Sequence, residues 1–528
     1  MKRILFIIAL SLVSQTHYVF AFDQGKELAG ASLKEKAVWI ERLASEPSER
    51  STRILQLWLD GELVYWRESD NLVRGIKEGR KYRLETLVSG EHLATVTSRE
   101  VKRVKTNNSL RKELKQTLGS RQLSSDERLV RLSAIAELKR KPDYGLLPIL
   151  KQREKKESDE DVSRHLSLLI GLVLLESPSA DEHLGGLSRI SGDLSPEVKD
   201  GLSRFIRNKQ LDPEVHKVAS RELRAIERSL MYWGIGQDLF FGLSLGSVLL
   251  LAAIGLAITF GVMGVINMAH GEFIMLGAYT TFVIQQIIPA NSFWSLVLSI
   301  PAAFIVAAAA GIILERLVIR HLYGRPLETL LATFGVSLIL QQFVRTVFGP
   351  LNQSVVTPEL LSGALDINAA FSMTYNRVFV IIFALSVLLA LWLVMHRTPF
   401  GMRVRAVTMN RGMASSMGIQ TKRMDALAFG LGSGVAGMAG VALSQLTNVG
   451  PNLGQSYIID SFMVVVFGGV GNLFGTVVAA FSLGVANKVL EPFSGAVLAK
   501  ILILVFIVLF IQKRPRGLFA LKGRAVED

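Results

Sequence analysis

Nine apolar runs dominate the second half of this 528-residue chain. They cover residues 239–265, 273–288, 293–314, 330–348, 378–395, 426–446, 456–467, 473–490 and 497–511. Residues 231–528 hold only 18 of the 59 basic and 11 of the 45 acidic residues. Two of these runs are short or interrupted. Apolar runs of about 20 residues cross a bilayer as helices, because each span must satisfy its own backbone hydrogen bonds in lipid. We therefore predict an all-α fold class, with a polytopic membrane bundle of about 8–9 segments over residues 231–528, which excludes a soluble enzyme for this half.

Residues 1–21 have the pattern of a secretory signal peptide. Lys2 and Arg3 precede the apolar stretch 4–13, and Val19 and Ala21 occupy the small-residue positions before a cleavage site. An uncleaved signal anchor is the alternative, although ten apolar residues are short for a span. Both interpretations predict that residues 22–230 are exported.

The exported domain is expected to be mainly helical and soluble. Apolar residues recur at three- and four-residue spacings over 126–138 and 161–175. The tripeptide Pro-Glu-Val occurs at 196–198 and again at 213–215, where it suits the first turn of a helix. Segments spaced by about 35 residues fit a HEAT-type helical repeat. Trp39, Trp58 and Trp66 are expected to fill a core.

Composition excludes several functions. The net charge of +14 comes with interleaved basic and acidic residues in the exported domain. No stretch there alternates basic and aromatic residues as a nucleic-acid groove does, so we expect no nucleic-acid partner. The chain has no Cys, which excludes disulfides, thiolate metal sites and Cys nucleophiles. We find no catalytic constellation and expect no cofactor.

The distribution of charge predicts the topology. If the exported domain is outside and the nine segments alternate, the loops at 316–325, 397–423 and 513–524 lie inside. These loops hold 14 of the 18 basic residues of this half, as the positive-inside rule requires. The C-terminus is then cytoplasmic, and the loop 350–376 is outside.

Small residues predict close helix contacts in the bundle. Gly430 and Gly434 form one series at four-residue spacing, and Gly432, Ala436 and Gly440 form a second, which allows close approach of backbones between spans. The segment 468–475, GGVGNLFG, lacks the Lys-Ser/Thr of a phosphate-binding loop. We interpret it as a break between a short and a long helix and as a candidate part of a transport pathway.

Two further segments could carry function. In INMAHGE (266–272), His270 and Glu272 suggest a metal or a proton relay, but the His-Glu-x-x-His spacing is absent and no third ligand follows, so we predict no metal site. A turn in which Asn267 and His270 bind backbone is the other interpretation. The basic segment 403–419 could dock into a groove of a soluble partner or form a solvated inside loop, and both interpretations remain open.

Several motifs together resemble a known family. They are GVMGVINMAHGEFIMLG (261–277), LATFGVS (331–337), the segment 403–419, GGVGNLFG (468–475) and RPRGLF (514–519). In order and spacing they resemble the branched-chain amino acid and amide permeases of ABC importers. The resemblance implies a bacterial inner-membrane permease subunit that is not an enzyme. It implies a second, similar permease subunit, two ATPase subunits and a periplasmic solute-binding protein as partners.

The resemblance also assigns roles to residues. The segment 403–419 is similar to the ATPase-docking loop of importers, although Arg405-Ala-Val stands where the wider pattern has Glu-Ala-Ala. The implied coupling residues are Arg403, Arg405, Ala406, Met409, Asn410, Ala414, Gly418 and Ile419.

An exported N-terminal domain is unusual in this family and resembles the urea-transporting members, so urea is the implied substrate. Candidate pathway residues for this neutral solute are Asn267, His270, Thr333, Ser337, Gln341 and Asn472. A branched-chain amino acid importer and a passive small-solute channel are the alternatives. The exported domain could dock the binding protein, sense a ligand or be accessory.

Overall fold

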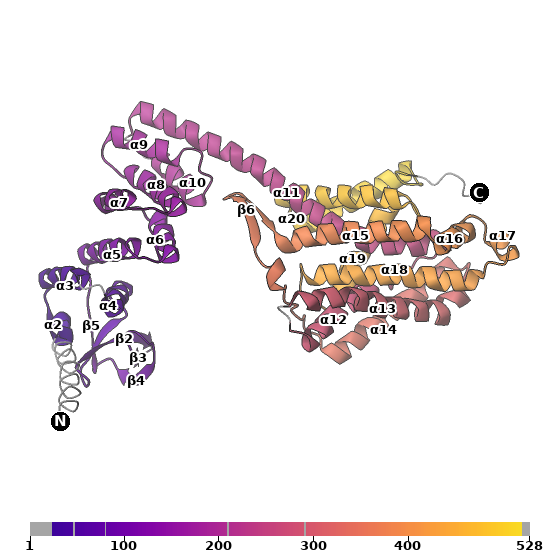
Figure 1. The fold of residues 1–528 in the computed structure, drawn as a ribbon, viewed down its shortest axis with the longest axis horizontal. Helices are drawn as coiled ribbons and strands as arrows, with labels where there is room; N and C mark the ends of the chain where they lie inside the picture. The colour runs from indigo at the N-terminus through magenta and orange to yellow at the C-terminus, as the bar shows by residue number, and fades with distance from the viewer. Residues whose placement is uncertain (1–23, 46–47, 80, 208–210, 290–291, 520–528) are drawn as a thin grey trace, which may run out of the picture. The chain divides into compact units, whose positions relative to one another are not determined.

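The computed structural model describes residues 24–45, 48–79, 81–207, 211–289 and 292–519 (Figure 1). The predicted signal peptide lies outside these residues. The chain divides into two compact units, Met1–Arg228 and Ser229–Asp528.

The first unit begins with three helices and an antiparallel sheet. Its first elements are α2 (Gln24–Gly30), α3 (Leu33–Ser45), α4 (Glu49–Asp60), β1 (Leu63–Trp66), β2 (Asn71–Glu78), β3 (Lys81–Glu85), β4 (His92–Thr97) and β5 (Val101–Arg103). The strand order is β4-β3-β2-β1-β5. Trp58, which is fully buried, packs with Leu55 and Leu63 in the core of this region.

The sheet is a difference from the sequence-based expectation, which gave this half a mainly helical fold without placing strands. Its core face is small and holds Val64, Val73, Leu84, Val96 and Val101. Three of the four pairings join strands that are neighbours in sequence, and only β1 with β5 is more distant. The strands are short and mix charged with apolar side chains, so their sequences give no clear alternation that would distinguish them from helix or loop.

Helices make up the rest of the first unit. They are α5 (Asn108–Leu123), α6 (Arg128–Arg140), η1 (Tyr144–Leu146), α7 (Leu147–Glu154), α8 (Glu160–Leu174), α9 (Ala180–Ile190) and α10 (Pro196–Ile206). Helix α8 is buried throughout residues 168–174 and contacts α6, α7, α9 and α10. Pro196 opens α10 at its first turn. The helical repeat itself stays a prediction.

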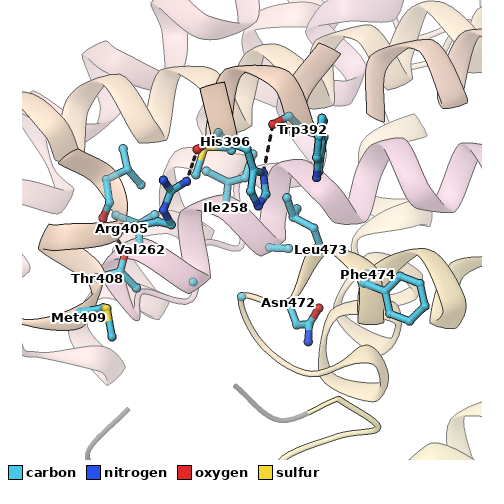
Figure 2. A pocket seen from close by; sticks show the side chains of 15 residues that line it. Ile258, Val262, Trp392, His396, Arg405, Thr408, Met409, Asn472, Leu473 and Phe474 are labelled. Carbon is cyan, nitrogen blue, oxygen red and sulfur yellow. Dashed lines mark hydrogen bonds between the residues drawn. The ribbon is translucent and has the colours of Figure 1, made fainter. Parts of the chain in front are cut away.

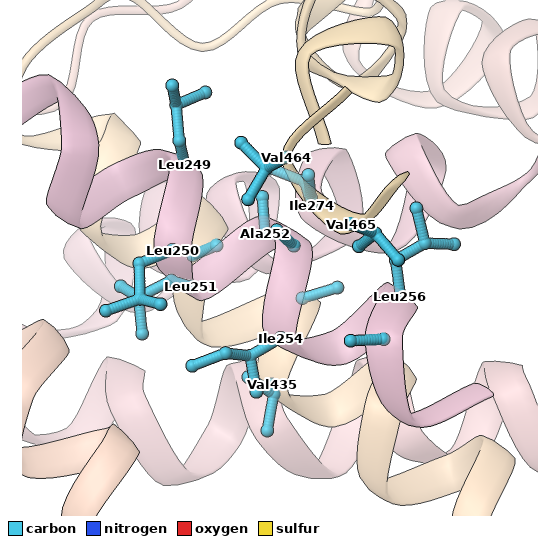
Figure 3. Close-up of a cluster of buried hydrophobic side chains, with 14 of the residues drawn as sticks. Leu249, Leu250, Leu251, Ala252, Ile254, Leu256, Ile274, Val435, Val464 and Val465 are labelled. Atoms are coloured by element: carbon cyan, nitrogen blue, oxygen red, sulfur yellow. The ribbon is translucent and has the colours of Figure 1, made fainter. Parts of the chain in front are cut away.

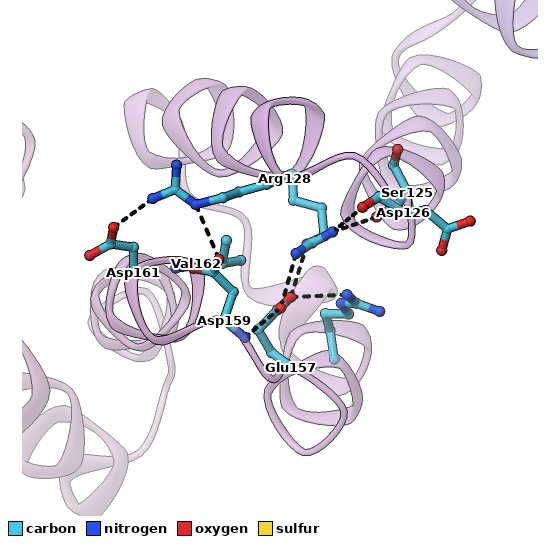
Figure 4. A network of polar contacts seen from close by, with 9 residues as sticks. Ser125, Asp126, Arg128, Glu157, Asp159, Asp161 and Val162 are labelled. Carbon is cyan, nitrogen blue, oxygen red and sulfur yellow. Dashed lines mark hydrogen bonds and ion pairs between the residues drawn. The ribbon is translucent and has the colours of Figure 1, made fainter.

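A buried polar network ties α6 to the start of α8 (Figure 4). Arg131 donates to the carbonyls of Ser125 and Asp126 at 2.9 Å and pairs with Glu157 at 3.1 Å. Burial alone would raise the pKa of Glu157, but hydrogen bonds from Asp159 and Arg153 and the charge of Arg131 lower it below its ordinary value. Glu157 therefore stays ionised at neutral pH and holds the loop in place.

The second unit is a helical bundle. Its elements are α11 (Pro213–Met263, which begins before the unit boundary), α12 (His270–Ile287), α13 (Phe293–Leu317), η2 (Ile319–Leu322), α14 (Pro326–Phe348), η3 (Glu359–Leu361), β6 (Ala364–Asn368), β7 (Phe371–Thr374), α15 (Tyr375–Arg397), α16 (Pro399–Met409), α17 (Arg411–Ser416), α18 (Thr421–Ser444), α19 (Leu453–Gly468) and α20 (Leu473–Lys513). Strands β6 and β7 form a hairpin in the loop before α15.

The bundle has the predicted helical membrane fold. Among the described residues, six helices are long and apolar enough to cross a membrane: α11, α13, α14, α15, α18 and α20. The shorter α12 and α19 occupy two further predicted segments. Helix α20 changes direction at Gly495, whose φ of 77° is non-helical, and this break separates the last two predicted runs.

Helix α11 supplies the centre of the core. Nearly every side chain from Val248 to Ile258 is buried, which is typical of a helix surrounded by other helices. Figure 3 shows Leu250, Leu251 and Ile254 of α11 together with Ile274 of α12 and Val435 of α18.

Helix α18 approaches three neighbours closely through its small residues. A Cβ added to Gly432 would lie 2.5 Å from the Gly255 carbonyl oxygen of α11, and one on Gly440 would lie 2.0 Å from the Ile274 carbonyl oxygen of α12. On the other face, added Cβ atoms on Gly430 and Gly434 would collide with side chains of α13. Ala436 is fully buried beside Gly255. The two glycine series therefore face different neighbours.

We expect Gly440→Ala to destabilise the bundle by about 1–3 kcal/mol, because the methyl group forces α12 and α18 apart. The measurement is the unfolding temperature of the purified protein in mild detergent. Gly335→Ala on α14 is the matched control, since an added Cβ there meets nothing within 4 Å. Equal unfolding temperatures for the two variants would contradict this interpretation of the α12–α18 contact.

Candidate functional site

A polar stripe runs along the buried face of α14. Thr329, Thr333, Ser337 and Gln341 recur every fourth residue and are at most 5% exposed. The other faces of this helix expose large apolar side chains such as Leu331, Leu338 and Phe343. A four-residue spacing places side chains on one face of a helix, so the stripe faces the bundle interior.

Glu272 is the centre of a polar cluster between α12 and α14. Its Oε1 accepts hydrogen bonds from Ser337 Oγ and Gln341 Nε2, both at 2.8 Å. One helical turn away, Thr333 Oγ1 accepts from the Met268 backbone N–H at 3.1 Å. Three predicted pathway residues therefore contact the INMAHGE segment.

Asn267 and His270 bind backbone. Asn267 Oδ1 accepts from the Ala269 N–H at 3.0 Å, and His270 Nε2 lies 2.9 Å from the Ala252 carbonyl oxygen of α11. Because a carbonyl only accepts, Nε2 carries the proton and Nδ1 is an acceptor. This geometry is the backbone-binding turn, one of the two interpretations of this segment.

Three polar atoms of this segment lack partners. Asn267 Nδ2, His270 Nδ1 and Glu272 Oε2 are buried and have no hydrogen-bond partner among the described residues. Buried polar groups in folded proteins are almost always paired, so three unpaired atoms within six residues indicate a place for water or a polar solute. No group of three or more His, Asp or Glu residues in the described part of the chain could hold a metal ion.

A cavity of about 480 Å³ lies among α11, α15, α16 and the start of α20. Figure 2 shows Arg405, Thr408 and Met409 of α16 opposite Asn472 and Phe474. His396 stacks on Trp392 at a centroid distance of 5.1 Å and forms part of the wall. The lining is mainly apolar, so the cavity can hold small uncharged molecules or apolar side chains.

Asn472 lies apart from the other five pathway candidates. Its Oδ1 accepts from the Gly475 N–H at 3.1 Å and caps α20, and its Nδ2 donates to the Phe519 carbonyl at 3.1 Å. The N–H groups of Leu518 and Phe519 donate to the carbonyls of Phe467 and Gly468. The two motifs 468–475 and 514–519 therefore form one structure, in which Asn472 positions backbone.

The predicted coupling residues lie on α16, α17 and the turn that follows. Ala414 is buried with Val407 and Met424, and Ala406 and Ile419 pack against them. Asn410 caps α17, and Gly418 adopts the left-handed conformation at φ 84°. Arg403 and Arg405 are exposed, although Arg405 also donates to the Met395 carbonyl.

Exposed methionines follow the same elements. Met409, Met413 and Met417 are 73%, 64% and 78% exposed and recur at four-residue spacing. Methionine side chains are flexible and polarizable, which suits a surface that binds another protein.

Arg411 attaches this segment to the bundle. Its guanidinium pairs with the buried Asp425 at the start of α18. It also donates to Tyr323 Oη at 2.6 Å and lies 4.3 Å from the ring centroid. Burial and the charge of Asp425 raise the pKa of Tyr323 to about 12, so the hydroxyl stays neutral and accepts this hydrogen bond. Arg411 therefore connects α17 to α18 and to the loop before α14.

Glu272, Arg411, Asp425 and Tyr323 were not among the sequence-based site residues. Glu272 was visible in the sequence as a carboxyl beside a membrane span, but only as a possible metal or proton group. Glu272 and Arg411 each contact side chains from other segments of the chain, so local spacing could not identify these contacts.

The fold and these features define a multi-pass membrane transport protein. Residues 239–511 match the family described as "Branched-chain amino acid transport system / permease component". The chain belongs to this family and is a transport subunit rather than an enzyme.

Proteins with similar sequences are also named as permeases. The high-affinity branched-chain amino acid transport system permease protein LivH of Salmonella typhimurium is 30% identical over 292 residues, which are 53% of this chain and 94% of that protein. The corresponding protein BraD of Pseudomonas aeruginosa is 29% identical over the same shares. LivM of Escherichia coli is 26% identical over 297 residues, which are 52% of this chain and 68% of that protein. No solved structure matches.

We predict that Gln341→Ala lowers stability by about 1–2 kcal/mol, because Glu272 loses a buried hydrogen bond. In a Glu272→Ala background the same change should cost much less, because the partner is already gone. The exposed neighbour Gln342 is the control, and Gln342→Ala should change stability by less than about 0.5 kcal/mol. The measurement is thermal unfolding in detergent. Additive effects of the two alanine substitutions would show that the cluster is not a unit.

Proposed function

We propose that this chain is one permease subunit of an ATP-driven importer that moves urea, or a related small amide, inward. The observation that carries the proposal is the set of unpaired polar atoms on Asn267, His270 and Glu272, beside the polar stripe of α14. Polar groups inside a membrane bundle are costly and mark solute pathways.

The chemistry of these atoms is complementary to an amide. Asn267 Nδ2 is a donor for a carbonyl oxygen, and His270 Nδ1 and the carboxyl oxygen Oε2 of Glu272 can accept from N–H groups. Urea offers one carbonyl oxygen and four N–H groups. Thr333, Ser337 and Gln341 add uncharged polar groups on the facing helix.

The coupling segment supports an ATP-driven mechanism. The exposed methionines of α16, α17 and the following turn offer an apolar surface to an ATPase subunit, and the Arg411–Asp425 pair connects that surface to α18. Closure of an ATPase pair would then shift α18 against its neighbours and alternate the access of the pathway. Such a mechanism requires a bundle with two stable arrangements.

The proposed assembly contains a second permease subunit, two ATPase subunits and a periplasmic solute-binding protein. It lies in a bacterial inner membrane with residues 22–230 periplasmic, after an N-terminal signal peptide, and with the C-terminus cytoplasmic. The similarity to both LivH and LivM supports the pairing of two related permeases.

Branched-chain amino acids are the second candidate cargo, because the relatives are named for them. An amino acid carboxylate needs a cation. Arg345, one turn beyond Gln341, is half-buried and donates to Asn452 Oδ1 at 2.7 Å, so it could serve as this cation.

Uptake of labelled urea and labelled leucine by the reconstituted complex tests the substrate. We expect ATP-dependent urea uptake that leucine does not compete with and that Arg345→Gln leaves unchanged. If the complex takes up leucine and Arg345→Gln abolishes that uptake, the transported solute is an amino acid rather than urea. Urea flux without ATP would make the protein a passive channel.

Coupling is tested by the double variant Met409→Ala/Met413→Ala. We expect it to lower solute-stimulated ATP hydrolysis and uptake together by about tenfold, because apolar anchors at the ATPase surface are lost. The control is Met231→Ala, which changes an exposed methionine outside the coupling elements. Normal stimulated hydrolysis in the double variant would contradict the proposed docking surface.

A further inference from the structure

The first unit contains a charged cavity of about 430 Å³ between α6 and α10. Its charged lining consists of Lys139, Arg140, Arg204, Arg207, Glu197 and Asp200. Four cations face two carboxylates, so the cavity has a positive field. It lies outside the residues 239–511 matched by the permease family.

The cations of this cavity are available for a ligand. None of the ion pairs between described residues of this unit includes any of the four. Arg204 and Arg207 use Nε to donate to carbonyls of their own helix turn, at 3.4 and 3.2 Å. Their terminal guanidinium nitrogens have no partner among the described residues, and these are the groups that bind anions in a bidentate manner.

Lys139 is the buried cation of this cavity. Its side chain is only 7% exposed, and Nζ lies 3.0 Å from His165 Nδ1. Burial and the charge of Lys139 lower the pKa of His165, so the ring is neutral and accepts the hydrogen bond. Burial lowers the pKa of Lys139, and the carboxylates of Asp193 and Glu197 oppose this without forming an ion pair with Nζ. A bound anion in contact with Nζ would stabilise the charged form directly.

The start of α10 also lines the cavity, through Pro196 in the first turn of this 11-residue helix. Asp193 Oδ1 accepts from the Ser195 N–H at 2.9 Å and Glu197 lies in the same turn, so carboxylates already occupy this helix end. The attraction for a further anion therefore comes from the four cations.

We propose that this cavity binds a small multivalent anion, either phosphate or a dicarboxylate, through Lys139, Arg140 and Arg204. Glu197 and Asp200 restrict access to ligands whose charge outweighs their own. The site gives the first unit a binding function separate from the transport pathway.

Isothermal titration calorimetry of the purified full chain tests whether the cavity binds an anion. The protein is kept in mild detergent and chloride buffer at fixed ionic strength. Inorganic phosphate and succinate are titrated separately, and saturable binding of one identifies the kind of anion. We expect Arg140→Gln/Arg204→Gln to weaken that binding by about tenfold or more. Both arginines are exposed, so the variant should fold, which thermal unfolding checks.

The matched control is Arg50→Gln, which removes the charge of an exposed arginine on α4 and should leave binding unchanged. Absence of saturable heat with both anions would overturn the proposal. Equal affinities of the double variant and the unaltered protein would also overturn it.

Discussion

Close contact between the backbones of α18 and its neighbours is the constraint on which the bundle depends. Gly432 meets Gly255 of α11, Gly440 meets Ile274 of α12, and Gly434 meets Phe304 of α13. Lipid tails are as apolar as leucine, so helix association in a membrane relies on such packing. Asp425, near the start of α18, pairs with Arg411 of α17, so the helix that organises the core is also tied to the segment that we propose docks ATPase subunits.

The polar cluster depends on the same packing. Gly271 and Gly454 bring α12 and α19 into backbone contact beside Glu272, while Ser337 and Gln341 hold its carboxyl from α14. A movement of α18 against α12 would alter the surroundings of Asn267 and His270. Our proposal that the segment 403–419 is coupled to a solute pathway rests on this connection.

Much of the bundle could be predicted from sequence, because each membrane helix makes its backbone hydrogen bonds within its own apolar run. The break at Gly495, for example, falls between two predicted runs. The sheet formed by residues 63–103 could not be predicted, because its strands are short and mix charged with apolar side chains without a clear alternation. Thr333, Ser337 and Gln341 were recognised as polar residues in a span, yet their contacts with α12 required the fold. The local role of Asn472 in capping α20 was also visible only in the structure.

The central claim is that α16 and α17 present a docking surface for ATPase subunits of an importer. Affinity purification of the tagged chain from its native membranes in mild detergent, followed by mass identification of every co-purifying protein, tests it most directly. We predict two ATPase subunits and a second permease. Repeated isolation of this chain alone, still conducting urea in liposomes, would contradict the claim.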